Sequence, residues 1–398
     1  SFAIEQRNFR GRAQQLSLSA SISSYAKSID VGFTEPYLFD RNLALGFNVF
    51  RRDYNSFTYN MNGNRNTTYQ QVTNGFQIRT GTALNEYWQT QFRYGLSFDN
   101  VTLDKNTFFS PNPDTGLMEC DPLLAGRYLC EAIGKYTTSS IGYSLVNDTL
   151  DNRIRPTRGQ RFIINQDFAG LGGSVRYVRT RVNYDRYWLL PANFVLNLGA
   201  EAGNIASLGG SDVRLTDRFF LGEPQMRGFG IRGVGPRILR KYRAGEQVGF
   251  DDPIVGERRN WSDDAIGGKN YYLARAEIEI PLGTGGRELG LRPSIFMDVG
   301  ALWGVKFPSL LNQPTEQKPQ LGIDGQPIKD ENGDIVYYMA PGFEEVALGN
   351  SKSPRVSVGI GVNWNSPMGP FRFDIAKVLR KVEGDDTQVF QFNVGTQF

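Results

Sequence analysis

The sequence is dominated by a period-two alternation of apolar and polar residues, which recurs in about fifteen segments along the chain. Successive side chains of a β-strand point to opposite faces, so this pattern predicts strands with one apolar and one polar face. Most segments are about 9 to 14 residues long, which suits a tilted membrane-spanning strand of about 9–11 residues better than a soluble strand of about five or six. We therefore predict an all-β fold, a transmembrane antiparallel β-barrel whose polar face lines a wet lumen.

Composition is consistent with this fold and narrows the function. No apolar run is long enough for a transmembrane helix, which needs about 18 or more residues. The 27 Phe and 18 Tyr suit aromatic girdles at the membrane interfaces, although an aromatic-rich soluble β protein is the alternative. A net charge of +3 gives no case for a nucleic-acid partner. Because the chain has no histidine, Ser-His and Cys-His hydrolases and the common zinc sites are excluded.

We accordingly expect no enzyme activity, no cofactor and no metal site, with a carboxylate-only catalytic site as the alternative. The two cysteines, Cys120 and Cys130, lie close together in one polar loop. In an exported protein we expect them to form a disulfide, whereas in a reducing compartment they would be free thiols.

The connections between the segments fall into two length classes. Residues 10–12, 85–86, 191–192 and 366–369 are tight turns, whereas the gaps 52–70, 104–135, 208–270 and 306–353 are long. Short turns on one side and long loops on the other are typical of an outer-membrane barrel, with the long loops outside the cell. A single-chain bacterial barrel has an even number of strands, so a count of about fifteen predicts that one strand lies upstream of Ser1 or is miscounted.

One glycine-rich stretch, residues 218–236, has neither strand nor helix periodicity, and we interpret it as a loop of defined shape. Arg227 lies at its centre between Met226 and Gly228, neither of which can pair with a charge. A guanidinium in this position needs a carboxylate or a solvated cavity. The alternation places two acids, Glu277 and Asp298, on polar faces of later strands.

Several motifs, in order along the chain from about Asn8 to Phe398, resemble the barrel of the BamA family, the insertases of the outer-membrane β-barrel assembly machinery. Met226-Arg227-Gly228-Phe229 is similar to the family's V-R-G-F/Y loop motif, with methionine in place of the usual valine. The other similar stretches are the F-x-D-x-G strand at 296–300, the S-P-L-G-P-L-x-F turn and strand at 366–373, the L-D…P-T-x-G turn at 150–159 and the terminal β-signal at 390–398.

The resemblance implies one outer-membrane β-barrel domain over residues 1–398, within a sixteen-stranded family barrel whose first strand lies mostly upstream of Ser1. It also implies periplasmic POTRA domains, which are absent from this chain. The loop at about 208–270 should fold back into the lumen, while the loops at about 104–135 and 306–353 lie on the cell surface. Arg227 should then contact Asp298, with Glu277 as a second partner; alternatively, Asp298 only solvates the lumen wall.

The function that the resemblance implies is insertion and folding of β-barrel proteins in the bacterial outer membrane, without covalent chemistry. A lateral seam between the first and last strands would open and accept a substrate strand by β-augmentation. The seam and terminal-signal residues are Phe390, Phe392, Val394, Gly395 and Phe398.

The implied partners are unfolded outer-membrane proteins, accessory lipoproteins, and outer-membrane lipids with lipopolysaccharide. Two alternatives stay open. One is a two-partner secretion transporter or another POTRA-barrel transporter, which the number of upstream POTRA domains would distinguish. The other, a general porin, should show a wide, constitutively open pore.

Overall fold

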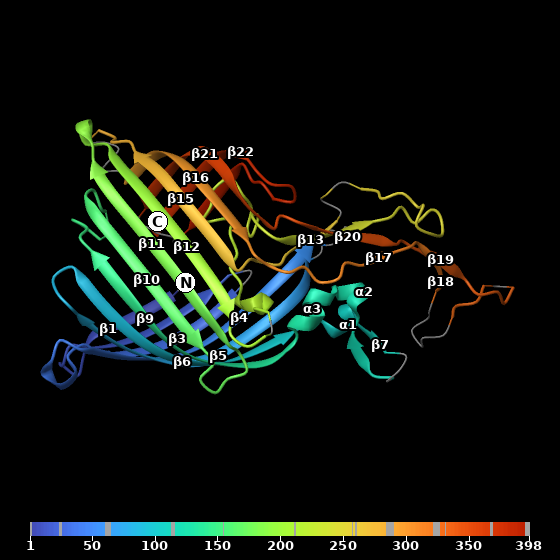
Figure 1. Ribbon diagram of the computed structural model, residues 1–398, viewed down its shortest axis with the longest axis horizontal. Helices are drawn as coiled ribbons and strands as arrows, with labels where there is room; N and C mark the ends of the chain where they lie inside the picture. Colours follow the sequence, from blue (N-terminus) through green and yellow to red (C-terminus); the bar gives the residue numbers. More distant parts are fainter. Residues whose placement is uncertain are drawn as a thin grey trace.

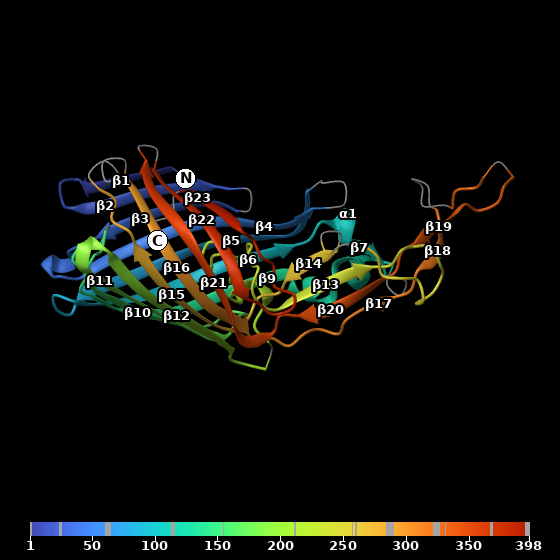
Figure 2. The same ribbon diagram turned by 90° about the horizontal axis from the view of Figure 1, so that it is seen from above.

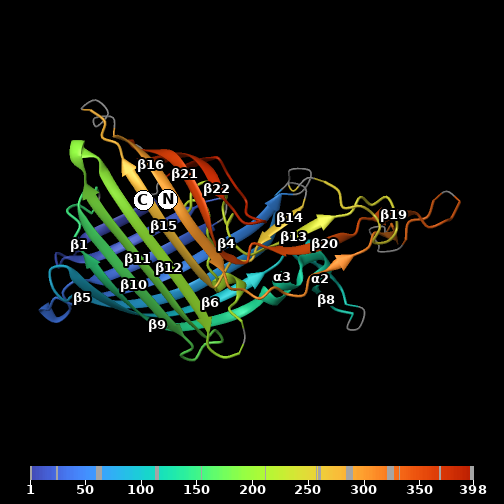
Figure 3. The ribbon, with the colours of Figure 1, turned by 45° about the horizontal axis from the view of Figure 1, so that its top comes forward.

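The structure, a computed structural model, describes residues 2–23, 26–59, 65–112, 116–153, 155–210, 212–256, 258, 261–283, 290–320, 327–330, 332–366 and 369–394. Its main feature is one antiparallel sheet of 15 strands that curls into the wall of a β-barrel (Figures 1, 2 and 3). The predicted fold class and strand number are confirmed. The strands of this sheet, in spatial order, are β1 (Phe2–Phe9), β2 (Gln14–Ile22), β3 (Ala26–Glu35), β4 (Ala44–Tyr59), β5 (Arg65–Ala83), β6 (Trp88–Thr102), β9 (Gly134–Asp148), β10 (Gly159–Ala169), β11 (Tyr177–Leu189), β12 (Val195–Ser207), β15 (Asn270–Glu279), β16 (Leu291–Trp303), β21 (Ser351–Ser366), β22 (Gly369–Arg380) and β23 (Phe390–Val394).

Neighbouring strands in the sheet are also neighbours in the chain, apart from the insertions. This order arises because each tight turn reverses the chain and lets the next segment pair antiparallel to the last. The two end strands are β1 and β23, and no ladder joins them within the described part of the chain. None of the helices in the described ranges has the length and apolar character required to span a membrane.

The two faces of the sheet follow the predicted alternation. On β16, Ile295 and Met297 are exposed on the outer face, whereas Phe296 and Asp298 are buried on the inner face. On β22, Phe373 and Ile375 are likewise exposed, between buried polar residues. The apolar face therefore points outward, as it must in lipid, and the polar face lines the interior.

The short turn between β9 and β10 shows how one carboxylate organises a connection. Asp151 Oδ1 accepts hydrogen bonds from the N–H groups of Thr157 at 2.9 Å and Arg158 at 3.1 Å, and Thr157 Oγ1 donates to Asp151 Oδ2 at 2.6 Å. Burial alone would raise the pKa of Asp151, but these donors lower it from 3.8 to about 2. The acid in the L-D…P-T-x-G stretch therefore caps the turn.

The long connections carry more regular structure than the sequence pattern indicated. The prediction of a loop at 52–70 is wrong over most of its length, because β4 continues to Tyr59 and β5 begins at Arg65. Aromatic and β-branched residues are frequent here, and their strand propensity lengthens the hairpin. The remaining elements are η1 (Leu38–Asp40), α1 (Lys105–Phe108), β7 (Phe109–Pro111), β8 (Met118–Cys120), α2 (Pro122–Ala125), α3 (Arg127–Ala132), η2 (Pro191–Asn193), η3 (Leu215–Asp217), β13 (Arg237–Tyr242), β14 (Ser262–Ala265), β17 (Asn312–Gln313), β18 (Glu316–Pro319), β19 (Tyr337–Ala340) and β20 (Phe343–Leu348).

A second sheet lies beyond the long-loop end of the barrel strands, on the right of Figure 1. Its strand order is β14-β13-β20-β17, so it combines strands from the 208–270 and 306–353 connections. Arg240 on β13 strengthens this joint, because its Nη2 donates to Glu345 Oε1 on β20 at 2.8 Å. The two regions predicted as separate loops are therefore one structural unit.

Candidate functional site

The candidate site is the lumen loop, defined here as residues 218–236 of the 208–270 connection, together with the inner faces of β15, β16, β21 and β22; β13 and β14 of the same connection belong to the second sheet. The loop can approach the wall closely because Gly228 has a left-handed φ of 85°. A Cβ added at Gly228 would lie 3.1 Å from Ser357 Cβ and 3.2 Å from Ala376 Cβ. The glycine of the M-R-G-F motif is thus required by both its backbone conformation and the close contact with β21 and β22.

Arg227 is held by Asp298 through a bidentate pair. Its Nε donates to Asp298 Oδ2 at 2.8 Å and its Nη2 to Asp298 Oδ1 at 2.6 Å. The backbone N–H of Arg227 also donates to Asp298 Oδ2, at 3.0 Å. Arg227 is 5% exposed and Asp298 0%, so the pair is shielded from solvent. The fork geometry fixes the direction of the guanidinium as well as its position.

Glu277 extends this pair into a larger charge network. Arg227 Nη1 donates to Glu277 Oε2 at 2.8 Å, and Arg372 Nη2 on β22 donates to Glu277 Oε1 at 3.1 Å. Arg372 Nε in turn donates to Asp374 Oδ2 at 2.8 Å. The structure therefore brings both predicted acids to Arg227 and adds a second arginine. Burial lowers the pKa of the Arg227 guanidinium, but Asp298 and Glu277 outweigh it and raise the pKa above its ordinary value.

Individual residues of the F-x-D-x-G strand contact individual residues of the loop motif. The guanidinium carbon of Arg227 lies 3.5 Å from the centroid of the Phe296 ring, a cation–π contact in a desolvated setting. A Cβ at Gly300 would lie 3.2 Å from Met226 Sδ, so this glycine leaves room for the methionine. Together with the Asp298 pair, these contacts explain why the two motifs have the residues they do.

Met226 and Phe229 are the apolar anchors of the loop. Both are fully buried, in a cluster with Leu221, Val234, Leu273 and Leu302. Burying a side chain of this size stabilises a fold by about 1.5–3 kcal/mol. A buried ion pair by itself is weak evidence for stability, so the apolar anchors hold the loop while the charges determine where it docks.

The terminal strand contacts the lumen loop through residues that sequence reasoning missed. Gln391 on β23 is 1% exposed, and its Nε2 donates to Phe229 O at 2.7 Å. The Asn393 side chain is hydrogen-bonded to Glu223 of the loop. Both alternate with the outward-facing residues of the terminal signal, so strand parity places them on the inner face but does not report their contact with the loop.

The predicted seam residues lie on the outer face where the structure describes them. Phe390, Phe392 and Val394 are exposed, and the Phe392 ring stacks on Phe373 with centroids 4.9 Å apart. Gly395 and Phe398 lie outside the described residues.

A second buried ion pair, also missed, fixes the connection between β22 and β23. Arg355 Nε on β21 donates to Asp385 Oδ2 at 2.9 Å, and both side chains are fully buried. Arg355 Nη2 also donates to Gly349 O at 2.8 Å, which satisfies more of the guanidinium. The connection is therefore held from the wall side by β21, as well as by the lumen loop.

In the 104–135 region, the structure joins Cys120 on β8 and Cys130 on α3 in a disulfide. Within the described ranges, no group of three or more His, Cys, Asp or Glu side chains could hold a metal ion.

Comparison with known proteins gives one family and consistent relatives. The Omp85 superfamily domain matches residues 8–398. The chain is 26% identical over 398 residues to the outer membrane protein assembly factor BamA of Neorickettsia risticii, covering 100% of this chain and 42% of that protein. The chain thus spans less than half the length of this relative.

Two solved structures show the same fold at low identity. BamA from Haemophilus ducreyi lacking POTRA domains 1–3 aligns with a TM-score of 0.68 at 21% identity, covering 98% of this chain and 65% of that one. CdiB from Acinetobacter baumannii aligns with a TM-score of 0.51 at 12% identity, covering 98% and 55%.

Proposed function

Because the chain belongs to the Omp85 superfamily, we propose that it inserts and folds β-barrel proteins in the bacterial outer membrane through a lateral seam between the first and last strands of the barrel, with β23 on one side of the seam. Its residence in the outer membrane follows from the superfamily, the BamA relative and the long strands with apolar outer faces. Insertion would make and break no covalent bonds and would proceed only by exchange of the hydrogen bonds that pair the strands.

The observation that carries this proposal is the unequal anchoring of the sheet. The wall from β15 to β22 is fastened by the Arg227 network, whereas the ladder between β22 and β23, as far as the structure describes it, runs from Phe371 to Ile375. At the other end, β1 pairs with β2 through an irregular register. A strand edge presents backbone donors and acceptors to an incoming strand, so weakly held end strands are suited to β-augmentation.

The proposed partners are unfolded outer-membrane proteins as substrates and accessory lipoproteins as helpers, with outer-membrane lipids and lipopolysaccharide around the barrel. The relative's name as an assembly factor supports the substrate class. The second candidate is export of a partner protein, as in two-partner secretion. It is supported by the CdiB likeness, whose TM-score of 0.51 is below the 0.68 of the BamA structure.

The seam can be tested with a cleavable bis-thiol cross-linker in the full-length protein in vesicles. Ile4→Cys on β1 and Phe392→Cys on β23 place one thiol on each side of the seam, at outward-facing exposed positions. Cross-linking this pair should slow insertion of an unfolded barrel protein at least about tenfold, and cleavage should restore the rate.

The matched control joins Ile4→Cys to Leu18→Cys, its register partner on β2, and should leave insertion unchanged. An unchanged rate with the β1–β23 cross-link in place would reject the seam. Export of a secreted partner without insertion activity would favour the transporter.

A further inference from the structure

The strand β22 is longer than its ladder with β23. That ladder ends at the pair Ile375 and Phe390, and the last backbone hydrogen bond runs from Ala376 N–H to Val389 O at 2.9 Å. β22 continues to Arg380, paired only with β21 in this stretch within the described part of the chain. Residues 377–380 therefore have a free edge on the side of the terminal strand.

The chain segment that could cover this edge is paired elsewhere. Residues 386–388 run along the lumen loop, with hydrogen bonds from Gly230 N–H to Asp386 O at 3.1 Å, from Asp386 N–H to Gly233 O at 2.8 Å and from Gln388 N–H to Gly228 O at 3.0 Å. Phe229 and Thr387 form an antiparallel bridge in the middle of this contact. For residues 386–388, the lumen loop thus takes the place of β22 as the pairing partner.

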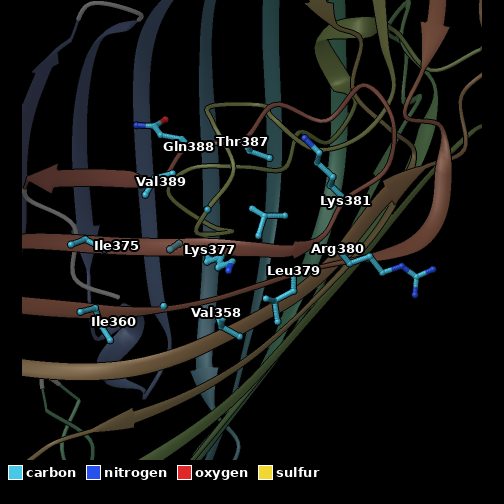
Figure 4. A pocket seen from close by; sticks show the side chains of 14 residues that line it. Val358, Ile360, Ile375, Lys377, Leu379, Arg380, Lys381, Thr387, Gln388 and Val389 are labelled. Atoms are coloured by element: carbon cyan, nitrogen blue, oxygen red, sulfur yellow. The ribbon is translucent and has the colours of Figure 1, made fainter.

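A cavity of about 760 Å³ lies between this segment and the free edge of β22. Its walls are Lys377 and Leu379 of β22 on one side and Thr387, Gln388 and Val389 on the other (Figure 4). Gly228 of the lumen loop also lines it. The segment therefore has open space toward the β22 edge and no packed core to cross.

Gln391 lies at the point where the segment leaves β22 for the loop. Its side chain donates from Nε2 to Phe229 O at 2.7 Å and accepts from Gly228 N–H through Oε1 at 3.4 Å. It thereby ties the first paired residues of β23 to the same loop residues that pair with Thr387 and Gln388. Leucine at this position would keep the side-chain size but lose both hydrogen bonds.

We propose that residues 386–389 are an exchangeable strand, paired either with the lumen loop or with the free edge of β22, and that Gln391 is the positioning residue that holds them on the loop. Continuing the existing β22–β23 register places Lys377 opposite Gln388 and Leu379 opposite Asp386. The second pairing satisfies backbone groups comparable to those that the first one loses. Because an open edge in lipid leaves backbone groups unsatisfied, undocking of the loop favours this longer ladder.

The role of this exchange at the seam rests on the proposed function, since it would couple the lumen loop to the length of the last ladder. A docked loop keeps β23 short and easily peeled from its neighbour. A released loop lets residues 386–389 cross the cavity and extend the ladder between β22 and β23.

The test is disulfide trapping in isolated outer membranes with the pair Leu379→Cys and Asp386→Cys. These residues would face each other at a non-hydrogen-bonded position of the longer ladder, within the Cα range of about 4.4–6.8 Å that a disulfide needs. The pair Phe373→Cys and Phe392→Cys, register partners in the existing ladder, reports whether β23 is still on the sheet.

Adding Gln391→Leu should raise the trapped fraction of the 379–386 pair severalfold and leave the 373–392 pair unchanged. The matched change Asn165→Leu should do neither, because this wall amide on β10 accepts from Ser144 Oγ at 2.6 Å within the ladder to β9. An unchanged 379–386 yield with Gln391→Leu would overturn the proposal, and so would a parallel loss of both pairs. Because trapping needs no substrate, a failed insertion assay would refute the function and not the exchange.

Discussion

The two ends of the large sheet are built from the same alternating pattern but are anchored differently. At the C-terminal end, the inner faces of β15, β16 and β22 are joined by buried ion pairs through Arg227 and Arg372. At the N-terminal end, every residue of β1 from Phe2 to Asn8 is exposed, and the inner face of β2 is mostly serine. Alternation makes strands in both places, but among the described residues buried ion pairs from a loop inside the barrel fix the C-terminal wall and not β1 or β2.

This difference has an energetic meaning. Removing one partner from the C-terminal network leaves charges buried without compensation, which costs far more than the intact pair contributes. The N-terminal edge depends on its backbone ladder and on a few side-chain contacts, such as Ser17 Oγ donating to Gly32 O at 3.4 Å. The same kind of substitution should therefore have a large effect at one end and a small effect at the other.

Arg227→Ala should have the largest effect, because it strands Asp298 and Glu277 on the inner wall. We expect a loss of about 3–5 kcal/mol in the free energy of unfolding, measured by denaturant unfolding in detergent. Arg51→Ala on β4 is the matched control: Arg51 pairs with Asp53 at 3.2 Å but is largely solvent-exposed. Its loss should stay within about 0.5 kcal/mol. Equal losses for both arginines would contradict the comparison.

Replacing both Cys120 and Cys130 with serine should have an intermediate, local effect. The disulfide closes a loop with a sequence separation of 10, and a loop of this size contributes roughly 2–3 kcal/mol by chain entropy. Proteolysis should become faster within 104–135 while the cavity-side contacts of the lumen loop keep their protection. The intact protein isolated without reductant should weigh two daltons less than its reduced form, and identical masses would refute the bridge.

Exchanging charges across the main pair should show coupling. Arg227→Asp and Asp298→Arg should each be strongly destabilising, and the double variant should recover about 1 kcal/mol relative to their sum. Recovery is partial because an acid at 227 would still face Glu277. A double-mutant cycle with no coupling would mean that Asp298 only solvates the wall.

At the opposite end, Ser19→Ala on β2 should have the smallest effect. Its side chain is exposed, so the change should alter the unfolding free energy by no more than about 0.5 kcal/mol. A loss above about 2 kcal/mol would show that the N-terminal edge is anchored by side chains after all.

The strands and the inner-wall acids could be predicted because both depend on local information. Parity along a strand assigns Asp298 and Phe296 to the same face from the sequence alone. The loop motif then identified the cation that those residues meet. The prediction of a loop at 52–70 was wrong because the many polar residues there interrupt the apolar alternation, although the aromatic and β-branched residues among them favour strands.

What could not be predicted depends on contacts between distant parts of the chain. Gln391 and Asn393 occupied correct inner-face positions, but nothing local distinguishes a side chain that binds a loop from one that faces water. The pairing of β13 with β20 joins Arg237 to Leu348 across separate connections, and no periodicity reports such a ladder. The ion pair of Arg355 with Asp385 could not be predicted for the same reason, because the two residues are separated in the chain by the whole of β22.

The lumen loop is synthesised before most of the polar residues that hold it. Its main polar partners, Asp298, Ser357, Asp385 and Gln391, all lie downstream of it in the chain. During N-to-C synthesis the loop is therefore made after its upstream apolar neighbours, such as Tyr177 and Ile205, but before these polar partners, and its full docking must wait for the later strands. A chain that ends before β15 would leave Arg227 without Glu277 and Asp298, and the loop should then be accessible to proteases. The docked loop is thus a structural record that the chain has been made through Gln391.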